Sequence, residues 1–138
     1  MRETPLLQLF MHAASMDLPH VRVFRRNIMG ARIEDRFVKA GIKGQCDTYA
    51  YVKGGRAIEL ETKSLDGTLS PQQEVWRDWC RAWGVPWLEL RPLAGEAPEQ
   101  TVTRWVIELR GLSEMCPHVI EDGVLCGLRY GHAGDHSP

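Results

Sequence analysis

Acidic and basic residues cluster around two predicted strands in the middle of the chain. Asp47 directly precedes the apolar run 48–52, and the next run, 58–62, is followed by Lys63. Because side chains alternate along a strand, Glu59, Glu61 and Lys63 share one face of the second run. Two carboxylates and an ammonium are costly to bury unless they pair with each other or hold a cation. The arrangement is typical of a metal-dependent hydrolase.

Two other interpretations of these residues stay open. In one, Asp47 only caps a turn, and Glu61 pairs with Lys63 as a structural ion pair. In the other, a shifted strand register puts Glu59 in the place of Glu61, although the acid-x-lysine spacing is then lost. We favour the hydrolase because charged groups beside glycine-rich loops usually have a function.

The composition predicts one compact domain with at most a small appendage. The chain has 138 residues, of which 43% are hydrophobic, enough for one core but not for two ordinary domains. It contains no apolar run of about 18 residues and no secretion-signal pattern near its beginning, so neither membrane spanning nor secretion is indicated. We therefore expect a cytoplasmic protein.

The charge is distributed unevenly between the two halves. Residues 1–63 carry 11 Lys/Arg against 7 Asp/Glu, a net of +4, whereas residues 64–138 carry 6 against 11, a net of −5. An anionic polymer would prefer the first half, where a basic, glycine-bearing connection over 27–44 suits a loop lying along phosphates. The alternative is a solvated charged surface. The candidate DNA contacts are Arg25, Arg26, Asn27 and Lys43.

The order of the expected elements predicts an α/β fold. These elements are an opening helix with Thr4 and Pro5 as cap and first-turn residue, a strand at 21–24, the central hairpin, a helix at 71–83, a strand at 85–90 and a helix at 99–112. The succession of strand, helix and strand favours a right-handed crossover with parallel pairing. We therefore expect a mixed central β-sheet flanked by helices.

The helix at 71–83 has the clearest start signal. Ser70 is the predicted N-cap, Pro71 the first helical residue and Gln73 the capping-box partner. An apolar stripe then leads to Gly84 and consists of Val75, Trp76, Trp79, Cys80 and Trp83. We expect these tryptophans in the core rather than on a base-stacking surface.

In this order and spacing, the sequence resembles the VRR-NUC family of small phage, bacterial and repair-associated nucleases, a branch of the PD-(D/E)XK nuclease superfamily. The resemblance spans about residues 3–91. It rests on Arg26-Asn27 with Gly30, on Gly41 to Asp47, on Glu61-Thr62-Lys63 and on Ser70-Pro71-Gln72-Gln73. It implies a restriction-endonuclease-like nuclease domain, which we place at residues 1–112.

The resemblance also implies roles for four residues. Asp47 and Glu61 would hold Mg²⁺ or Mn²⁺, hard cations that favour oxygen ligands. Lys63 would orient the attacking water or stabilise charge on the phosphate, while the metal activates the water and polarises the phosphodiester. Gln73 matches the family's glutamine after Ser-Pro, although the capping box alone also explains it.

Two further positions bear on the resemblance. Glu3 is a candidate match for an acidic residue of the first helix that faces the site. Cys46 stands where the family usually has a proline before the aspartate. This variation is not expected to abolish metal binding.

The last segment, residues 113–138, predicts a separate zinc-binding tail, a small Cys/His zinc knuckle. Tetrahedral Zn²⁺ takes four nitrogen or sulfur ligands, and His118 is a fifth candidate. The predicted ligands are Cys116, Cys126, His132 and His136. Because the segment has few apolar residues, metal binding would have to supply its folding free energy. The alternative is a disordered tail with incidental thiols.

Together these features predict a Mg²⁺/Mn²⁺-dependent deoxyribonuclease, a hydrolase acting on ester bonds. The resemblance implies a structure-selective endonuclease in phage or bacterial replication, recombination or repair, working in the host cytoplasm if phage-encoded. Its partner would be DNA, and a homodimer is one expected assembly. Two alternatives stay open. One is a catalytically inactive nucleic-acid-binding module with the nuclease fold, and the other is a structural or regulatory partner that makes its contacts through the tail.

Overall fold

The computed structural model of the chain describes residues 3–26, 30–39, 41–115, 119–121 and 124–125, with side chains described at 5–26, 34–36 and 41–115. These residues form three helices, a four-stranded sheet and two separate strand pairs. In chain order the elements are α1 (Glu3–Asp17), β1 (Val21–Arg25), β2 (Gly30–Ile33), β3 (Arg36–Lys39), β4 (Thr48–Val52), β5 (Arg56–Thr62), α2 (Pro71–Ala82), β6 (Trp87–Leu90), α3 (Pro98–Glu114), β7 (Val119–Glu121) and β8 (Val124–Leu125).

The main sheet has the strand order β1-β4-β5-β6. The first three strands pair antiparallel, while β5 and β6 pair parallel across the crossover made by α2. The predictions of an α/β fold with a mixed sheet, and of parallel pairing after the central helix, are confirmed. The predicted zinc knuckle lies largely outside the described residues.

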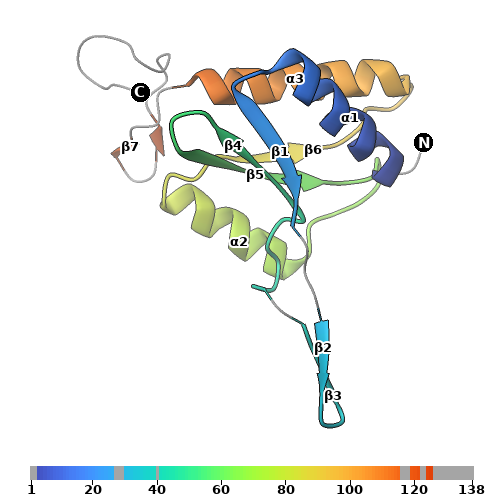
Figure 1. Cartoon of the computed structure of the whole chain (residues 1–138), viewed down its shortest axis with the longest axis vertical. Coiled ribbons are helices and arrows are strands. Elements are labelled where there is room, and N and C mark those ends of the chain that lie inside the picture. The colour runs from blue at the N-terminus through green and yellow to red at the C-terminus, as the bar shows by residue number, and fades with distance from the viewer. Residues whose placement is uncertain (1–2, 27–29, 40, 116–118, 122–123, 126–138) are drawn as a thin grey trace.

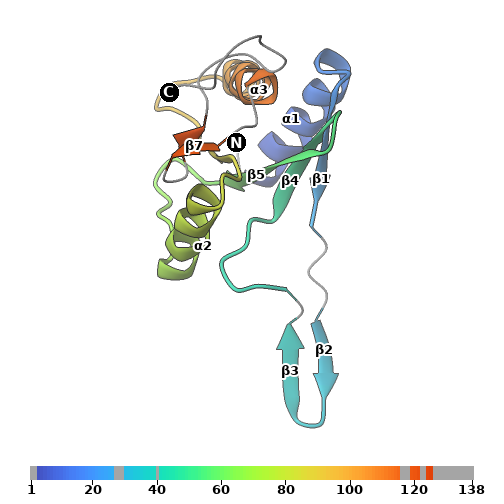
Figure 2. The same ribbon diagram turned by 90° about the vertical axis from the view of Figure 1, so that its left-hand side faces the viewer.

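The hydrophobic core lies between one face of this sheet and the helices α1 and α3. Figures 1 and 2 show α1 and α3 together on one side of the sheet and α2 on the other. Phe10 of α1 and Trp105 of α3 are fully buried and meet edge to face, with ring centroids 5.8 Å apart. The strands contribute the buried residues Val21, Ala50, Val52, Ile58, Leu60 and Leu90 to this core.

The opposite face of the sheet is polar and aromatic. By alternation, Glu59 and Glu61 point away from the apolar core that Ile58 and Leu60 join. Both carboxylates are still only 7% exposed. This face, partly covered by α2, is therefore where ionisable groups are buried.

The connection predicted as a loop contains an additional hairpin. Strands β2 and β3 pair antiparallel, with Ile33 opposite Arg36, and extend away from the main sheet (Figures 1 and 2). Their two-residue turn is Glu34-Asp35, and Glu34 has a positive φ of 58°. Two-residue hairpin turns usually contain Asn-Gly or Asp-Gly. This turn contains neither, so the sequence lacked the usual hairpin signal.

The two helix starts differ from each other in how well they were predicted. Helix α2 begins as expected: the Gln73 N–H donates to Ser70 Oγ at 3.2 Å, and the Ser70 N–H donates to Gln73 Oε1 at 2.9 Å. Helix α1 begins at Glu3, so Thr4 lies inside the helix and does not cap it, contrary to the prediction.

The prediction that the α2 tryptophans belong to the core is wrong. Trp79 is 42% exposed and Trp83 is 70% exposed, and Cys80 is the buried residue of this helix. The rings instead stack on one another, with centroids 4.9 Å apart for Trp76 and Trp79 and 5.3 Å apart for Trp79 and Trp83. The physical reason is that α2 covers the polar face of the sheet, away from the hydrophobic core.

The described part of the chain contains no helix with the length and apolar character needed to cross a bilayer.

Candidate active site

The centre of the candidate site is a hydrogen-bonded chain of Glu61, Gln73 and Lys63. Glu61 lies near the carboxyl end of β5, and Lys63 follows that strand directly. The Lys63 ammonium donates to Gln73 Oε1 at 2.7 Å, and Gln73 Nε2 donates to Glu61 Oε1 at 3.1 Å. Lys63 Nζ also lies 3.9 Å from Glu61 Oε1. The acid and the ammonium are thus held side by side through one amide.

The position of Gln73 follows from the start of α2. Its amide oxygen accepts from both the Ser70 N–H and Lys63, and its amide nitrogen is left to donate to Glu61. This orientation satisfies an ammonium donor and a carboxylate acceptor at once. The capping box and the contact with the predicted catalytic pair are therefore two uses of the same side chain.

The loop that carries Asp47 is fixed from two sides. The backbone N–H of Arg26 donates to the Asp47 carbonyl at 2.6 Å. Gly44 has a φ of +87°, and a Cβ built there would lie 2.2 Å from the carbonyl oxygen of Gln72. Only glycine allows this close approach of the loop to the start of α2. The Asp47 side chain is exposed and lies one residue before Thr48, which pairs with Leu60, the neighbour of Glu61.

Glu59 has a partner of its own. Arg26 donates two hydrogen bonds to its carboxylate, at 3.0 and 2.8 Å, and a third to the Cys46 carbonyl at 2.5 Å. The Arg26 guanidinium also lies 4.6 Å from the centre of the Tyr49 ring. A bidentate pair of this kind neutralises Glu59, whereas Glu61 contacts Gln73 and Lys63. Glu59 and Glu61 therefore have different partners, although they share one face of β5.

Two cysteine thiols line the same polar interior. Burial, followed by the charges of Glu61 and Glu59, raises the pKa of Cys46 far above its usual range. Burial and the charge of Glu59 also raise the pKa of Cys80, to about 11. Both thiols therefore stay protonated at neutral pH. The Cys46 thiol is therefore a neutral hydrogen-bond donor to Glu61 and Glu59.

Glu89 is a neighbour of the site that no local motif of the sequence indicates. Glu89 is the register partner of Glu61 on the parallel strand β6, and its carboxylate accepts from Arg91 Nε at 2.5 Å. The alternation of residues 85–90 would have put it on this face once the parallel pairing was known. Glu89 could therefore be found only from the pairing of β6 with β5, and not from a motif in the sequence.

The other predicted residues are distributed around this centre. Arg25, at the end of β1, and Lys43 are exposed, and Arg26 is half-buried against Glu59. The side chain of Glu3 lies outside the described residues. So do Asn27 and the five candidate zinc ligands of the tail, Cys116, His118, Cys126, His132 and His136.

The described side chains bring Glu61, Lys63 and Gln73 into contact, whereas Asp47 is exposed on the adjoining loop, one residue before the strand that pairs with β5. Within the ranges described, no group of three or more His, Cys, Asp or Glu side chains is arranged to hold a metal ion. A cation here would have two predicted carboxylate ligands and would take its remaining ligands from elsewhere. Mg²⁺ commonly binds in this way, through one or two carboxylates with water and substrate phosphates.

In comparisons with known proteins, no family model matches the sequence, and no curated protein matches it either. Membership of the VRR-NUC family therefore stays a prediction based on the motifs.

Proposed function

We propose that this chain is a Mg²⁺- or Mn²⁺-dependent nuclease that hydrolyses DNA phosphodiester bonds, with a restriction-endonuclease-like core of the VRR-NUC type. The observation that carries the proposal is the Glu61–Gln73–Lys63 chain of hydrogen bonds beside the loop that bears Asp47. It combines a buried carboxylate with an ammonium and supports both by a rigid helix start. Pre-organised charge of this kind is what phosphoryl-transfer chemistry needs.

The donor chemistry of the site fits a hard cation. Asp47 and Glu61 are the residues that would hold it, and their oxygens suit Mg²⁺ or Mn²⁺ better than a softer metal. When bound, the ion would lower the pKa of a water molecule and polarise the scissile phosphate. The exposure of Asp47 leaves room for the water and phosphate oxygens that would complete the shell.

Lys63 is suited to act on the water or the phosphate. Its ammonium has three N–H donors, and Gln73 Oε1 accepts one of them. The remaining donors are available to orient a nucleophile or to offset charge on the transferred phosphate. Gln73 acts on the same reaction as a positioning residue, because it fixes the directions of both Lys63 and Glu61.

The DNA would reach this site along the basic first half of the chain. Arg25 and Lys43 are exposed on the segments that flank the β2–β3 hairpin. The hairpin extends away from the sheet (Figure 2), so it offers a surface along which a duplex or junction arm can lie. Such phosphate contacts would position the DNA without reading its sequence.

The test is cleavage of labelled duplex, flap and four-way-junction DNA by the purified chain with Mg²⁺ or Mn²⁺. We expect cleavage that requires the cation, stops in EDTA and is lost in Lys63→Ala. Cleavage that persists in Lys63→Ala, or that does not depend on a divalent cation, would refute the assignment.

A second candidate function is a nucleic-acid-binding module that keeps the fold without catalysis. It is favoured by the 3.9 Å approach of Lys63 Nζ to Glu61 Oε1, because a structural ion pair there needs no cation. The same experiment separates the two functions, because the module would bind the junction in every condition and cleave it in none.

We also propose that the tail, residues 113–138, holds a structural Zn²⁺ through Cys116, Cys126, His132 and His136. The described part of this segment includes the short antiparallel pair β7–β8, which lies in the sequence between the two cysteines. Elemental analysis of the full chain should give one zinc per protein, and the double variant Cys116→Ser, Cys126→Ser should give none. Equal zinc content in both proteins would refute this ligand set.

A further inference from the structure

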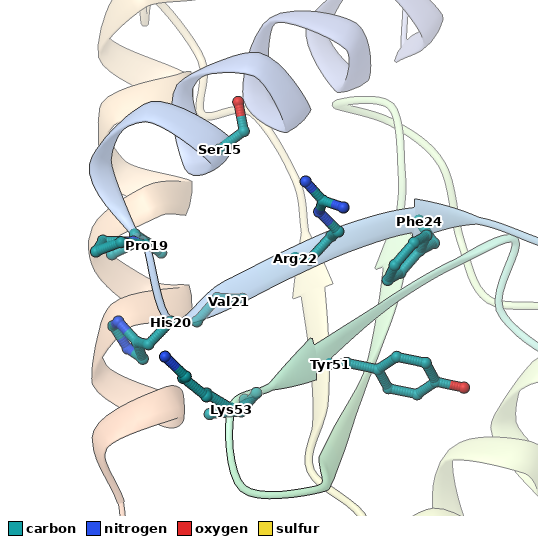
Figure 3. Close-up of a pocket in the computed structure, with 10 residues that line it drawn as sticks. Ser15, Pro19, His20, Val21, Arg22, Phe24, Tyr51 and Lys53 are labelled. Carbon is teal, nitrogen blue, oxygen red and sulfur yellow. The ribbon is translucent and has the colours of Figure 1, made fainter.

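A groove along the edge strand β1 lies apart from the candidate active site. It has a volume of about 440 Å³ and is bounded by the end of α1, by β1 and by the end of β4 (Figure 3). Its charged lining residues are Arg22 and Lys53, with His20 beside them. No carboxylate is among the described residues that line it. The groove therefore favours an anionic occupant.

The groove also has an aromatic wall. Phe24 and Tyr51 line it (Figure 3), and Tyr49 adjoins them, with the three ring centroids 5.2 to 5.6 Å apart. Tyr51 is 54% exposed although it is large and apolar over most of its surface. A ring held in place by two others and open on its outer side is suited to stack on a flat heterocycle.

The strand register connects this wall to the candidate active site. Arg22 pairs with Tyr51 and Phe24 pairs with Tyr49, while Tyr49 in turn pairs with Glu59 of β5. These residues therefore lie on the same sheet face as Glu59 and Glu61. From Ala57, the partner of Tyr51, to Glu61 is four residues along β5, or roughly 14 Å at the rise of a strand. An extended chain of a few nucleotides can cover that distance.

From this geometry we infer that the groove and its aromatic wall bind an unpaired DNA strand, with a base stacked on Tyr51 and phosphates held by Arg22 and Lys53. Cations favour the phosphates, and an open aromatic ring favours a base whose face is free. The bases of a duplex are already stacked on each other, so a paired segment would gain little from Tyr51. The inference deepens the proposed function, on which it rests, by adding a single-stranded arm to the substrate.

The test measures binding separately from cleavage. Fluorescence anisotropy without added Mg²⁺ or Mn²⁺ would follow labelled oligothymidylate, with a blunt duplex of the same length as the comparison. Tyr51→Thr removes the ring but keeps a residue that favours strands. Trp83→Ala is the matched control, because Trp83, the residue that follows α2, is a still more exposed aromatic residue.

We expect Tyr51→Thr to weaken oligothymidylate binding about 10-fold and to leave duplex binding within about twofold. Tyr51→Phe, which keeps the ring, and Trp83→Ala should both bind like the wild type. Arg22→Ala and Lys53→Ala should each reduce the slope of log affinity against log salt by about 0.7. Unchanged oligothymidylate binding in Tyr51→Thr, or an equal loss in Trp83→Ala, would overturn the inference.

The result is distinguishable from a failure of the proposed function. If the protein binds oligothymidylate through Tyr51 but never cleaves DNA, the nuclease assignment is wrong and the inference about the groove stands. If the protein cleaves DNA with Mg²⁺ and binds the oligonucleotide independently of Tyr51, the inference about the groove is wrong and the nuclease assignment stands.

Discussion

The Lys63 ammonium and the Gln73 amide oxygen are joined by a hydrogen bond of 2.7 Å, and that oxygen also accepts the N–H of the Ser70 N-cap. The start of α2 and the candidate active site thus depend on one side chain. Any change at Gln73 should affect both helix stability and cleavage, so the two effects need separate variants.

Gln73→Ala and Ser70→Ala form such a pair. Both remove part of the capping box, so each should lower the free energy of unfolding by about 0.5 to 2 kcal/mol. Gln73→Ala also removes the contacts to Lys63 and Glu61, and we expect it to reduce cleavage about 10- to 100-fold, as loss of an outer-shell partner usually does. Ser70→Ala should cleave like the wild type per folded molecule. Equal cleavage by both variants would show that Gln73 serves only the helix.

Gly44→Ala should destabilise the fold more than Gly55→Ala. Both glycines have positive φ, +87° and +100°, so both alanine variants carry a backbone strain of about 1 to 2 kcal/mol. At Gly44 the added Cβ would also meet the Gln72 carbonyl, whereas nothing lies within 4 Å at Gly55. Urea denaturation of the two variants measures the difference. Equal stability would mean that the loop bearing Asp47 is not fixed against α2.

Truncation of Trp105 and of Trp83 should have very different effects on stability. Trp105 is fully buried against Phe10, so Trp105→Ala should cost about 3 to 5 kcal/mol of unfolding free energy. Trp83 is 70% exposed, so Trp83→Ala should change that free energy by no more than about 0.5 kcal/mol. Chemical denaturation tests both. A large loss of stability in Trp83→Ala would mean that Trp83 packs in the core.

The hydrogen-bonded carboxylate of Glu96 should make the stability of the fold depend on pH. This effect is separate from the candidate active site. Hydrogen bonds from Arg104, then from Thr101, lower the pKa of Glu96 from 4.5 to about 2. Because the folded state favours the charged form, this contribution is complete above pH 4.5 and is lost as the pH falls towards 2. Glu96→Gln should therefore melt at a lower temperature than the wild type at pH 6, with a difference that shrinks below pH 4.5. A difference independent of pH would exclude the carboxylate as its source.

Local signals predicted much of the fold. Ser70, Pro71 and Gln73 predicted where α2 begins, and the alternation around Glu59 and Glu61 predicted which side chains share a face. Parallel pairing of β6 with β5 followed from the order of strand, helix and strand. These features depend on neighbours in the sequence, which is why they could be derived without a structure.

The features that could not be predicted depend on distant contacts. The stripe of α2 indicated an apolar face, but not that the helix would cover acids and leave Trp79 and Trp83 exposed. Arg26 and Glu59 are 33 residues apart, and no local pattern pairs them. The β2–β3 hairpin was missed because its turn uses Glu34 in a conformation that glycine or asparagine usually supplies.

We propose that Glu61, and not its neighbour Glu59, belongs to a metal-dependent cleavage site. The most direct test compares DNA cleavage by Glu61→Gln and Glu59→Gln in Mn²⁺, at a temperature at which both variants are folded. The two carboxylates are equally buried and share one strand face, so each variant is the control for the other. We expect a loss of at least about 100-fold in Glu61→Gln and a rate close to that of the wild type in Glu59→Gln. Loss in Glu59→Gln with retention in Glu61→Gln, or no cleavage by the wild type, would contradict the proposal.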